Sequence, residues 1–337
     1  MTKPPIERFE TPNGVHIFRL PLEVFNGYIG MAHLLLYEGK STLIDVGSGY
    51  SNSPADLEQG FAALRNEYRL DVSLSGLDRI IITHGHVDHF GGLRQVQDIA
   101  ANAIIACHEL TRPVLLKHDE RVLLAKAGMD AFLQRAGVPD ERRNALMNMF
   151  MLGKQAFPVM RVDETLHDGD LIDELIQVIH VPGHAPGQVM LLIDDVLLTA
   201  DHVLPQTSVA LAPETIMPYT GVGHYIEALQ RAQSVTGVRM ALGGHEEPME
   251  DYPSVVQGTL DSAMKKVERV LEHCDEPRSI YDIACRIYDS MAGYSELLKI
   301  EQTGARVEYL TQRGYLLIEN LNELETQSNP KLTYQRV

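Results

Sequence analysis

Short apolar runs alternate with turn-forming residues along the first hundred positions and again between residues 175 and 242. Alternating apolar and polar positions, or brief apolar runs bounded by turns, are typical of strands. The sequence predicts strands over residues 15–20, 33–37, 41–46, 79–83, 103–106, 175–181, 189–193, 196–199 and 239–242. Apolar residues at helical spacing predict helices over 57–68 and 91–99.

Two other segments have a pattern of apolar and polar residues that predicts helices instead of strands. Residues 111–157 contain no strand-like run and are rich in Leu, Met, Ala and charge, which predicts a helical insertion. Beyond residue 253 the pattern predicts helices over 255–273, 280–288 and 296–310, then a short strand at 315–318. The last dozen residues are polar, and we expect them to be frayed. The chain is therefore predicted to divide into a domain over 1–250, which carries the insertion, and a small mostly helical domain over 251–337.

Composition and charge narrow the class of protein. The 337 residues are 45% hydrophobic and 22% charged, the profile of a soluble globular protein. The formal charge of −17 gives a surface that repels nucleic acid and anionic membranes on average. Neither the N-terminus nor any internal run is apolar enough for a signal peptide or a membrane span. We expect a cytoplasmic protein that acts on a small molecule, without a membrane or nucleic acid as partner.

The cysteines offer no chemistry of their own. Cys107, Cys274 and Cys285 are widely separated and form no CxxC motif. Neither a disulfide framework nor a thiolate zinc site is therefore expected, and free thiols suit a reducing cytoplasm.

The strongest chemical signal is the segment Thr83-His84-Gly85-His86-Val87-Asp88-His89, between a predicted strand and a predicted helix. Imidazoles buried in a core would each need a polar partner, whereas imidazole and carboxylate are preferred ligands of zinc, iron and similar ions. A spacing of two puts His84 and His86 on the same side of an extended segment. Asp88 and His89 follow where the chain turns into the helix, so one short loop can serve two adjacent metal ions.

Further candidate ligands follow later strands. His184 lies in a tight Pro-Gly turn after the strand at 175–181. Asp201 and His245 follow the strands at 196–199 and 239–242. Each of these alone is more typical of an ordinary loop residue, but together they supply what the first cluster lacks.

The motifs HxHxDH, PGHxPG, a strand-end Asp and a strand-end Gly-His occur in this order, and residues 15–250 thereby resemble the metallo-β-lactamase superfamily. The resemblance implies an α/β fold, the αββα sandwich, with metal ions at one edge. It also implies that one metal is held by His84, His86 and His184, a second by Asp88, His89 and His245, and that Asp201 bridges them.

Two residues are expected behind these ligands. Asp45, in Leu43-Ile44-Asp45-Val46-Gly47, matches the structural carboxylate of the family. His202, next to Asp201, is either a polar partner of the site, a proton carrier or a packed strand-end residue.

The chain departs from the family pattern at three positions. Gln188 ends the motif PGHAPGQ, where many relatives have His. Ala200 precedes Asp201, and Glu246 follows His245, where relatives often have Gly. No departure removes a ligand.

The resemblance implies a hydrolase with two divalent ions, zinc first and iron or manganese as alternatives, that share a bridging hydroxide. Asp201 would then set the metal spacing, and Asp88 would relay a proton. The predicted substrate is a small-molecule ester, lactone or thioester. The alternatives are a phosphodiesterase or ribonuclease on the same metal site, an iron-dependent oxidoreductase, and a non-catalytic regulator. The charge opposes a nucleic-acid substrate, and His86 stands where flavin-linked relatives usually have Glu.

Two accessory segments complete the picture. The helical insertion is predicted to be a lid or pocket wall that selects the substrate. Residues 251–320 resemble, less specifically, the small winged-helix-like domain appended to some superfamily members. Its third predicted helix carries Glu296, Glu301 and Glu308 beside only Lys299 and Arg306, a poor charge for a phosphate-lined groove. We expect this domain to pack against the hydrolase domain or against a second subunit in a homo-oligomer.

Overall fold

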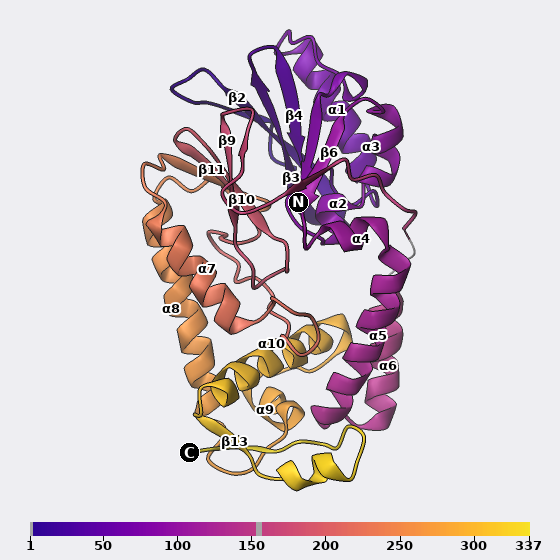
Figure 1. Ribbon diagram of the computed structural model, residues 1–337, viewed down its shortest axis with the longest axis vertical. Helices are drawn as coiled ribbons and strands as arrows, with labels where there is room; N and C mark the ends of the chain where they lie inside the picture. The colour runs from indigo at the N-terminus through magenta and orange to yellow at the C-terminus, as the bar shows by residue number, and fades with distance from the viewer. Residues whose placement is uncertain (1–2, 153–156) are drawn as a thin grey trace. The chain divides into compact units, whose positions relative to one another are not determined.

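The computed structural model describes residues 3–152 and 157–337 (Figure 1). These residues cluster into two compact units, each built from segments that lie far apart in the sequence. The first unit contains the described residues within 1–118, 157–209 and 229–256. The second contains those within 119–156, 210–228 and 257–337.

A seven-stranded sheet forms one layer of the first unit. Its strands are neighbours in chain order, namely β1 (Glu7–Glu10), β2 (His16–Phe25), β3 (Tyr28–Tyr37), β4 (Lys40–Ile44), β5 (Arg79–Ile82), β6 (Ile104–His108) and β7 (Glu164–Leu166). The first four strands are antiparallel, and β4 to β7 are parallel. The β2–β3 hairpin turns at Gly27, whose φ of 73° favours glycine. Because β4, β5 and β6 run parallel, their carboxyl ends meet at one edge of the sheet.

A five-stranded sheet forms the second layer. In spatial order its strands are β12 (Met240–Gly243), β11 (Val196–Ala200), β10 (Val189–Ile193), β9 (Ile176–His180) and β8 (Leu171–Ile172). Strands β11 and β12 are parallel, and the remaining neighbours are antiparallel. The segments that follow β11 and β12 therefore leave the sheet at the same end.

The apolar residues of both sheets build the core of the first unit. One cluster fills the space between the sheets, where Leu35 of β3 and Val178 of β9 are fully buried. A second cluster covers the opposite face of the seven-stranded sheet. Helices α1 (Ser53–Asn66) and α3 (Leu93–Ile99) lie on this side of the sheet (Figure 1). Phe61 of α1 and Leu93 of α3 belong to the cluster. The predicted α/β class is confirmed, with sheets flanked by helices.

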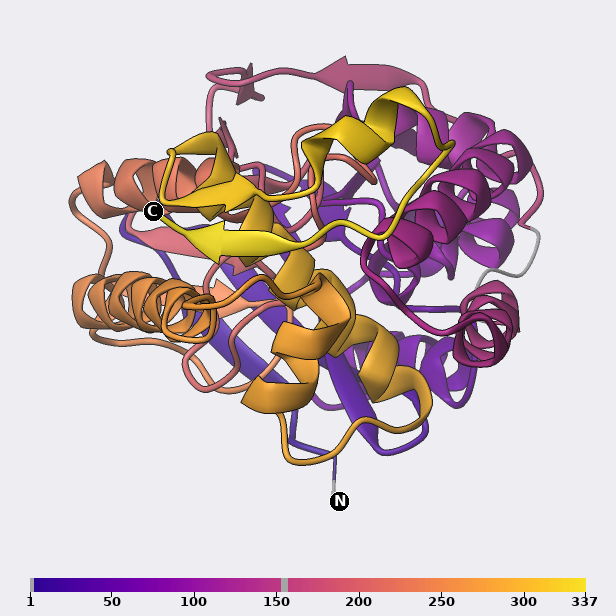
Figure 2. The same ribbon diagram turned by 90° about the horizontal axis from the view of Figure 1, so that it is seen from below.

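The second unit is mainly helical. Its main elements are α5 (His118–Arg135), α6 (Asp140–Leu152), α9 (Ile280–Ile287), α10 (Gly293–Gln312), β13 (Leu316–Ile318) and β14 (Tyr334–Arg336). Helix α10 contacts α6, α9 and β13, and β13 pairs antiparallel with β14 (Figure 2). Helix α9 begins with a capping box, in which Ser279 and Asp282 each accept a hydrogen bond from the backbone N–H of the other. This cap fixes where the helix starts.

The remaining elements are short or contribute residues to both units. Helices α7 (Val222–Ser234) and α8 (Tyr252–Leu271) have residues in each unit. The short elements are α2 (Val87–Phe90), α4 (Arg112–Leu116) and two 3-10 turns, Leu74–Gly76 and Leu321–Glu325. Over the described parts of the chain, no helix combines the length and the apolar character that a membrane span requires.

The structure confirms most of the predicted elements and corrects one. The insertion is helical as α4, α5 and α6, although residues 153–156 lie outside the described part of the chain. The expectation of a frayed C-terminus is wrong, because Leu332 and Tyr334 are buried and β14 pairs with β13. Helix α7 has no counterpart among the predicted elements. The division at residue 250 stays a prediction.

Candidate metal centre

All seven predicted ligands lie in the first unit, at the ends of strands. The loop after β5 and the short helix α2 carry His84, His86, Asp88 and His89. The segments after β9, β11 and β12 carry His184, Asp201 and His245. The parallel strands of each sheet thus bring residues from distant parts of the sequence to one edge.

The first ligand group consists of His84, His86 and His184. One ring nitrogen of each lies within 4.8 Å of the ring nitrogens of the other two. His84 and His184 are buried and His86 is half-buried. Nε2 of His84 lies 3.1 Å from Nδ1 of His86. Three imidazoles therefore converge at this point.

The turn that presents His184 is tied to its surroundings by its backbone. The carbonyl of Pro186 lies 2.8 Å from Nε2 of His180. The hydroxyl of Thr111 donates to the carbonyl of Gly187 over 3.0 Å. The ring of His180 is stacked on that of His108, with centroids 4.0 Å apart. The position of His184 is therefore fixed through its turn.

The second ligand group consists of Asp88, His89, Asp201 and His245, with one ligand atom of each within 4.8 Å of the others. Oδ1 of Asp201 lies 3.3 Å from Nε2 of His89 and 3.5 Å from Nε2 of His245. Oδ2 of Asp88 lies 3.3 Å from Nε2 of His245. Two carboxylates thus face two imidazoles.

Hydrogen bonds behind these imidazoles set their orientation. Nδ1 of His89 lies 2.8 Å from Oδ2 of Asp45, and Nδ1 of His245 lies 2.8 Å from the carbonyl of Ile29. Asp45 also accepts hydrogen bonds from the backbone N–H and the hydroxyl of Thr83. Because Nδ1 of each ring faces an acceptor, Nε2 is left to face the ligand group. Asp45 therefore lies directly behind the ring of His89.

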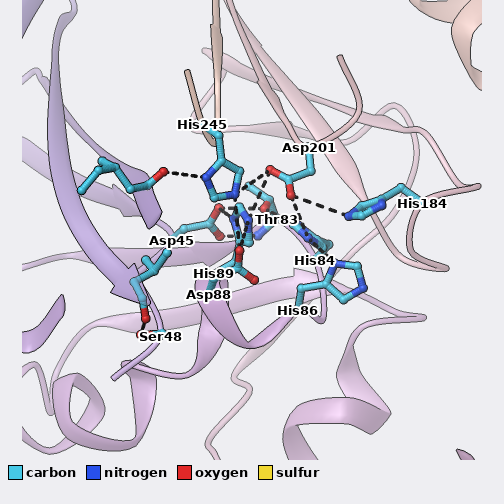
Figure 3. Close-up of polar contacts among 12 residues, drawn as sticks. Asp45, Ser48, Thr83, His84, His86, Asp88, His89, His184, Asp201 and His245 are labelled. Carbon is cyan, nitrogen blue, oxygen red and sulfur yellow. Dashed lines mark hydrogen bonds and ion pairs between the residues drawn. The ribbon is translucent and has the colours of Figure 1, made fainter. Parts of the chain in front are cut away.

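Asp201 lies between the two groups (Figure 3). Its Oδ1 faces the second group, as described above. Its Oδ2 lies 3.7 Å from Nε2 of His184 and 4.0 Å from Nε2 of His84. Each oxygen of this carboxylate thus faces a different set of imidazoles.

Two backbone features make room for Asp201. A Cβ atom on Gly244 would lie 2.6 Å from Oδ1 of Asp201 and 2.7 Å from Cε1 of His89, so no larger residue fits. Ala200, which precedes Asp201, has a φ of 46°. This left-handed conformation is strained for a residue with a Cβ and persists only where the surroundings hold it.

The electrostatics of the two groups differ. Burial, followed by the neighbouring imidazoles of His89 and His86, lowers the pKa of His84 well below its ordinary value. Burial also acts to lower the pKa of His245, but the carboxylates of Asp201 and Asp88 outweigh it and raise that pKa to about 10. Burial acts to raise the pKa of Asp88, but the imidazole of His89 outweighs it and lowers that pKa to about 2. The second group thus combines carboxylates with imidazoles, whereas the first consists of imidazoles alone.

These residues fit two metal ions. Nε2 of His89, Nε2 of His245 and Oδ1 of Asp201 are buried, and no described residue gives them a well-directed hydrogen bond. Buried polar atoms are rarely left in this state unless an ion or another group completes them. Imidazole nitrogen and carboxylate oxygen are also the ligand atoms that zinc and similar divalent ions take.

The structure adds residues that the sequence gave no reason to select. The ring of Tyr28, at the start of β3, lies on that of His245 with centroids 4.6 Å apart. The carbonyl of Ile29 acts through the backbone, so its side chain carries no signal of this role. His202 is fully buried beside Asp201, and its role stays a prediction.

Sequence comparison decides the family. The sequence profile of the metallo-β-lactamase superfamily matches residues 26–245, about two thirds of the chain. The chain belongs to this superfamily. Members of the superfamily are generally hydrolases, and the matched segment contains all seven candidate ligands of this member.

Individual relatives agree with this assignment. The probable metallo-hydrolase YqjP of Bacillus subtilis is 23% identical over 296 residues, which cover 84% of this chain and 88% of YqjP. The acyl-coenzyme A thioesterase MBLAC2 of Gallus gallus is 25% identical over 173 residues, which cover 49% of this chain and 55% of MBLAC2.

Solved structures show the same superfamily fold. The metallo-β-lactamase family protein TTHA1429 of Thermus thermophilus superimposes with a TM-score of 0.75 at 21% identity, covering 95% of this chain and 98% of that one. A β-lactamase domain protein of Burkholderia ambifaria gives a TM-score of 0.71 at 20% identity, covering 98% and 95%. The likeness therefore extends beyond the metal-ligand region to nearly the whole chain.

Proposed function

We propose that this protein is a dinuclear metal-dependent hydrolase that cleaves a small-molecule ester, lactone or thioester. His84, His86 and His184 would hold one ion, Asp88, His89 and His245 the second, and Asp201 both. Zinc is the first candidate for each site, with iron or manganese as alternatives, because the mixed imidazole and carboxylate ligands accept all three.

The observation that carries this proposal is the placement of Asp201. Its Oδ2 faces the histidines of the first group at 3.7 and 4.0 Å, and its Oδ1 faces those of the second at 3.3 and 3.5 Å. A carboxylate that served one ion would need only one of these faces. The two-sided arrangement supports a bridging role and hence two adjacent ions.

Two bound divalent ions would supply Lewis acidity and would lower the pKa of a water molecule from about 15.7 to near 7. The protein's own residues orient the reaction. Asp45 and the carbonyl of Ile29 fix the rings of His89 and His245. The carboxylate of Asp88 lies at the edge of the group, with its side chain 16% exposed, while His89 and His245 are only 2% exposed. Asp88 is thus placed to accept a proton from the nucleophile and to release it to the leaving group or to solvent.

The choice among acyl substrates rests on a likeness to one relative and on the net charge of the chain. The relative MBLAC2 is named as an acyl-coenzyme A thioesterase, and it matches half of this chain. That likeness supports the thioester arm of the proposal. The formal charge of −17 supports a small substrate over a nucleic acid.

The test is a substrate panel on protein loaded with zinc, iron or manganese. It should contain an acyl-coenzyme A thioester, an activated aryl ester, a lactone and an aryl phosphodiester. We expect turnover of at least one of the first three, loss of turnover with a strong chelator and recovery on adding back the ion. Asp88→Asn, which keeps the size of the side chain and removes its basicity, should lower kcat by about 100-fold or more.

Other outcomes would overturn the proposal in distinguishable ways. Cleavage of the phosphodiester alone would keep the metal centre and replace the substrate class. Oxygen consumption without hydrolysis would favour an oxidoreductase. Two bound ions without turnover of any substrate in the panel would contradict the assigned substrate classes.

A further inference from the structure

Gln188 is a fully buried polar residue that lies next to the proposed ligands without being one of them. It directly precedes β10, and it follows the turn that carries His184. A buried carboxamide must satisfy both its oxygen and its nitrogen, since an unmatched amide in a protein interior costs about 1–3 kcal/mol. Its hydrogen bonds therefore show what it holds in place.

The carboxamide oxygen of Gln188 faces two backbone N–H groups. In the orientation that satisfies both ends of the amide, this oxygen accepts from the backbone nitrogen of Asp201 at 3.2 Å and from that of His202 at 2.5 Å. The N–H of His202 also faces the carbonyl of Thr199 at 3.0 Å. Gln188 is thus bonded to the backbone that bears the carboxylate lying between the two ligand groups.

The backbone at this point needs such support. Strand β11 is irregular between Leu198 and Ala200, and Ala200 has a φ of 46°. The N–H groups of Asp201 and His202 follow this strained residue, where the ladder to β12 ends. A strained residue keeps its conformation only when nearby contacts determine it, and Gln188 supplies contacts on the following two residues.

We propose that Gln188 is a positioning residue that sets the direction of the Asp201 carboxylate and thereby the affinity of the centre for its metal ions. This inference rests on the proposed function, because it assigns to Asp201 the bridging role. It also gives a physical role to the Gln that ends the motif PGHAPGQ, where many relatives have His. The carboxamide at this position can present one oxygen to both N–H groups.

Three variants separate the hydrogen bond from the packing. Gln188→Met keeps the length and most of the volume of the side chain and removes the acceptor. Gln188→Asn keeps the amide and shortens its reach by one methylene. Gln188→Glu keeps an oxygen at the same distance and serves as the conservative control.

The readout is metal affinity, measured by competition of the zinc-loaded protein with a chelator of known affinity. We expect Gln188→Met and Gln188→Asn to weaken zinc binding by about 10- to 100-fold, the usual effect of losing a partner behind a ligand. Gln188→Glu should stay within about tenfold of the wild-type affinity. Hydrogen exchange at the amides of Asp201 and His202 should be faster in the first two variants and unchanged in the third.

The results separate this inference from the proposed function. If Gln188→Met and Gln188→Asn lower the melting temperature but keep wild-type zinc affinity, Gln188 is only a core residue and the inference fails. Equal losses of zinc affinity in all three variants would also overturn it, because the acceptor would then not matter. If Gln188→Met does not fold, Gln188→Asn and Gln188→Glu still give the comparison. A wild-type protein that binds fewer than two zinc ions would instead contradict the dinuclear centre itself.

Discussion

The two ligand groups are held in different ways. In the second group the protein bonds directly to the rings, since Asp45 holds His89 and the carbonyl of Ile29 holds His245. In the first group Nδ1 of His84 lies 3.1 Å from the hydroxyl of Thr83, and the turn that carries His184 is bonded through Thr111 and His180. The second group also contains its own negative charge, whereas the first consists of imidazoles alone.

This difference indicates how each ion would depend on the protein. Binding at the second group should respond to changes in single hydrogen bonds behind the rings, because these bonds aim Nε2. Binding at the first group should respond more to the conformation of the turn at residues 182–187. Asp201 faces both groups, so we expect its loss to weaken metal binding at both of them.

The largest effect is expected for Asp201→Ala. Without the carboxylate between the groups, neither the spacing nor the affinity of the two ions is maintained, and kcat/KM should fall by about 1,000-fold or more. His202→Ala, at the adjacent buried position, should lower it by less than about 100-fold. Activity and metal content of both folded variants provide the measurement. Equal losses of activity with unchanged metal content would contradict the bridging role.

Asp45→Asn should weaken metal binding mainly at the second group, because Asp45 holds the ring of His89. The amide can still accept from Thr83 but no longer presents a carboxylate to Nδ1 of His89. We expect the affinity for one of the two ions to fall by about 10- to 100-fold and the other to change less. Thr111→Val, which removes only the hydrogen bond to the turn at Gly187, is the matched variant on the other side. Chelator titrations that show both ions weakened alike by Asp45→Asn would remove the distinction between the groups.

The smallest effect is a loss of folding stability at low pH that arises from His108. The ring of His108 stacks on that of His180, which contacts the turn carrying His184. Burial, and then the stacked ring of His180, lower the pKa of His108 to about 4. The unfolded chain, with an ordinary His pKa near 6.5, therefore binds more protons between pH 6.5 and 4, and the folded protein loses stability as the pH falls through that range. Exchanging the imidazole for a ring that cannot titrate, as in His108→Phe, should reduce the loss between pH 6.5 and 5 by about 2 kcal/mol. Urea unfolding at the two pH values measures it, and an identical loss in wild type and variant would exclude His108 as the source.

Much of the fold could be predicted because its strands are short and strongly apolar. Residues 189–193 were predicted as a strand with the bounds that β10 shows. Helix α7 was missed although its residues are amphipathic, because the long segment before it lacks a clear start signal. The C-terminal strand β14 was not predicted because the tail is mostly polar, and its buried residues Leu332 and Tyr334 show no strand-like run in the sequence. Its partner strand β13 lies outside the tail.

The candidate site was predictable in its residue types but not in its supports. The spacing of histidines and aspartates at strand ends predicts them as metal ligands. The structure places all seven candidate ligands in two neighbouring groups. Gln188 was noticed only as a departure from a motif, since its partners are backbone N–H groups thirteen and fourteen residues away. The same holds for Ile29, whose carbonyl reaches His245 across the sheet edge. Contacts made by the backbone depend on the fold and leave little trace in the residue types.

The central claim is that two metal ions bind side by side in each chain. Elemental analysis of freshly purified protein, with protein concentration from amino-acid analysis, tests it most directly. Expression in a metal-replete medium and the Asp201→Ala variant provide the reference points. The account predicts about two divalent ions per wild-type chain, because both ligand groups are complete and Asp201 faces each of them. One ion or none per chain, after metal-replete growth, would contradict it.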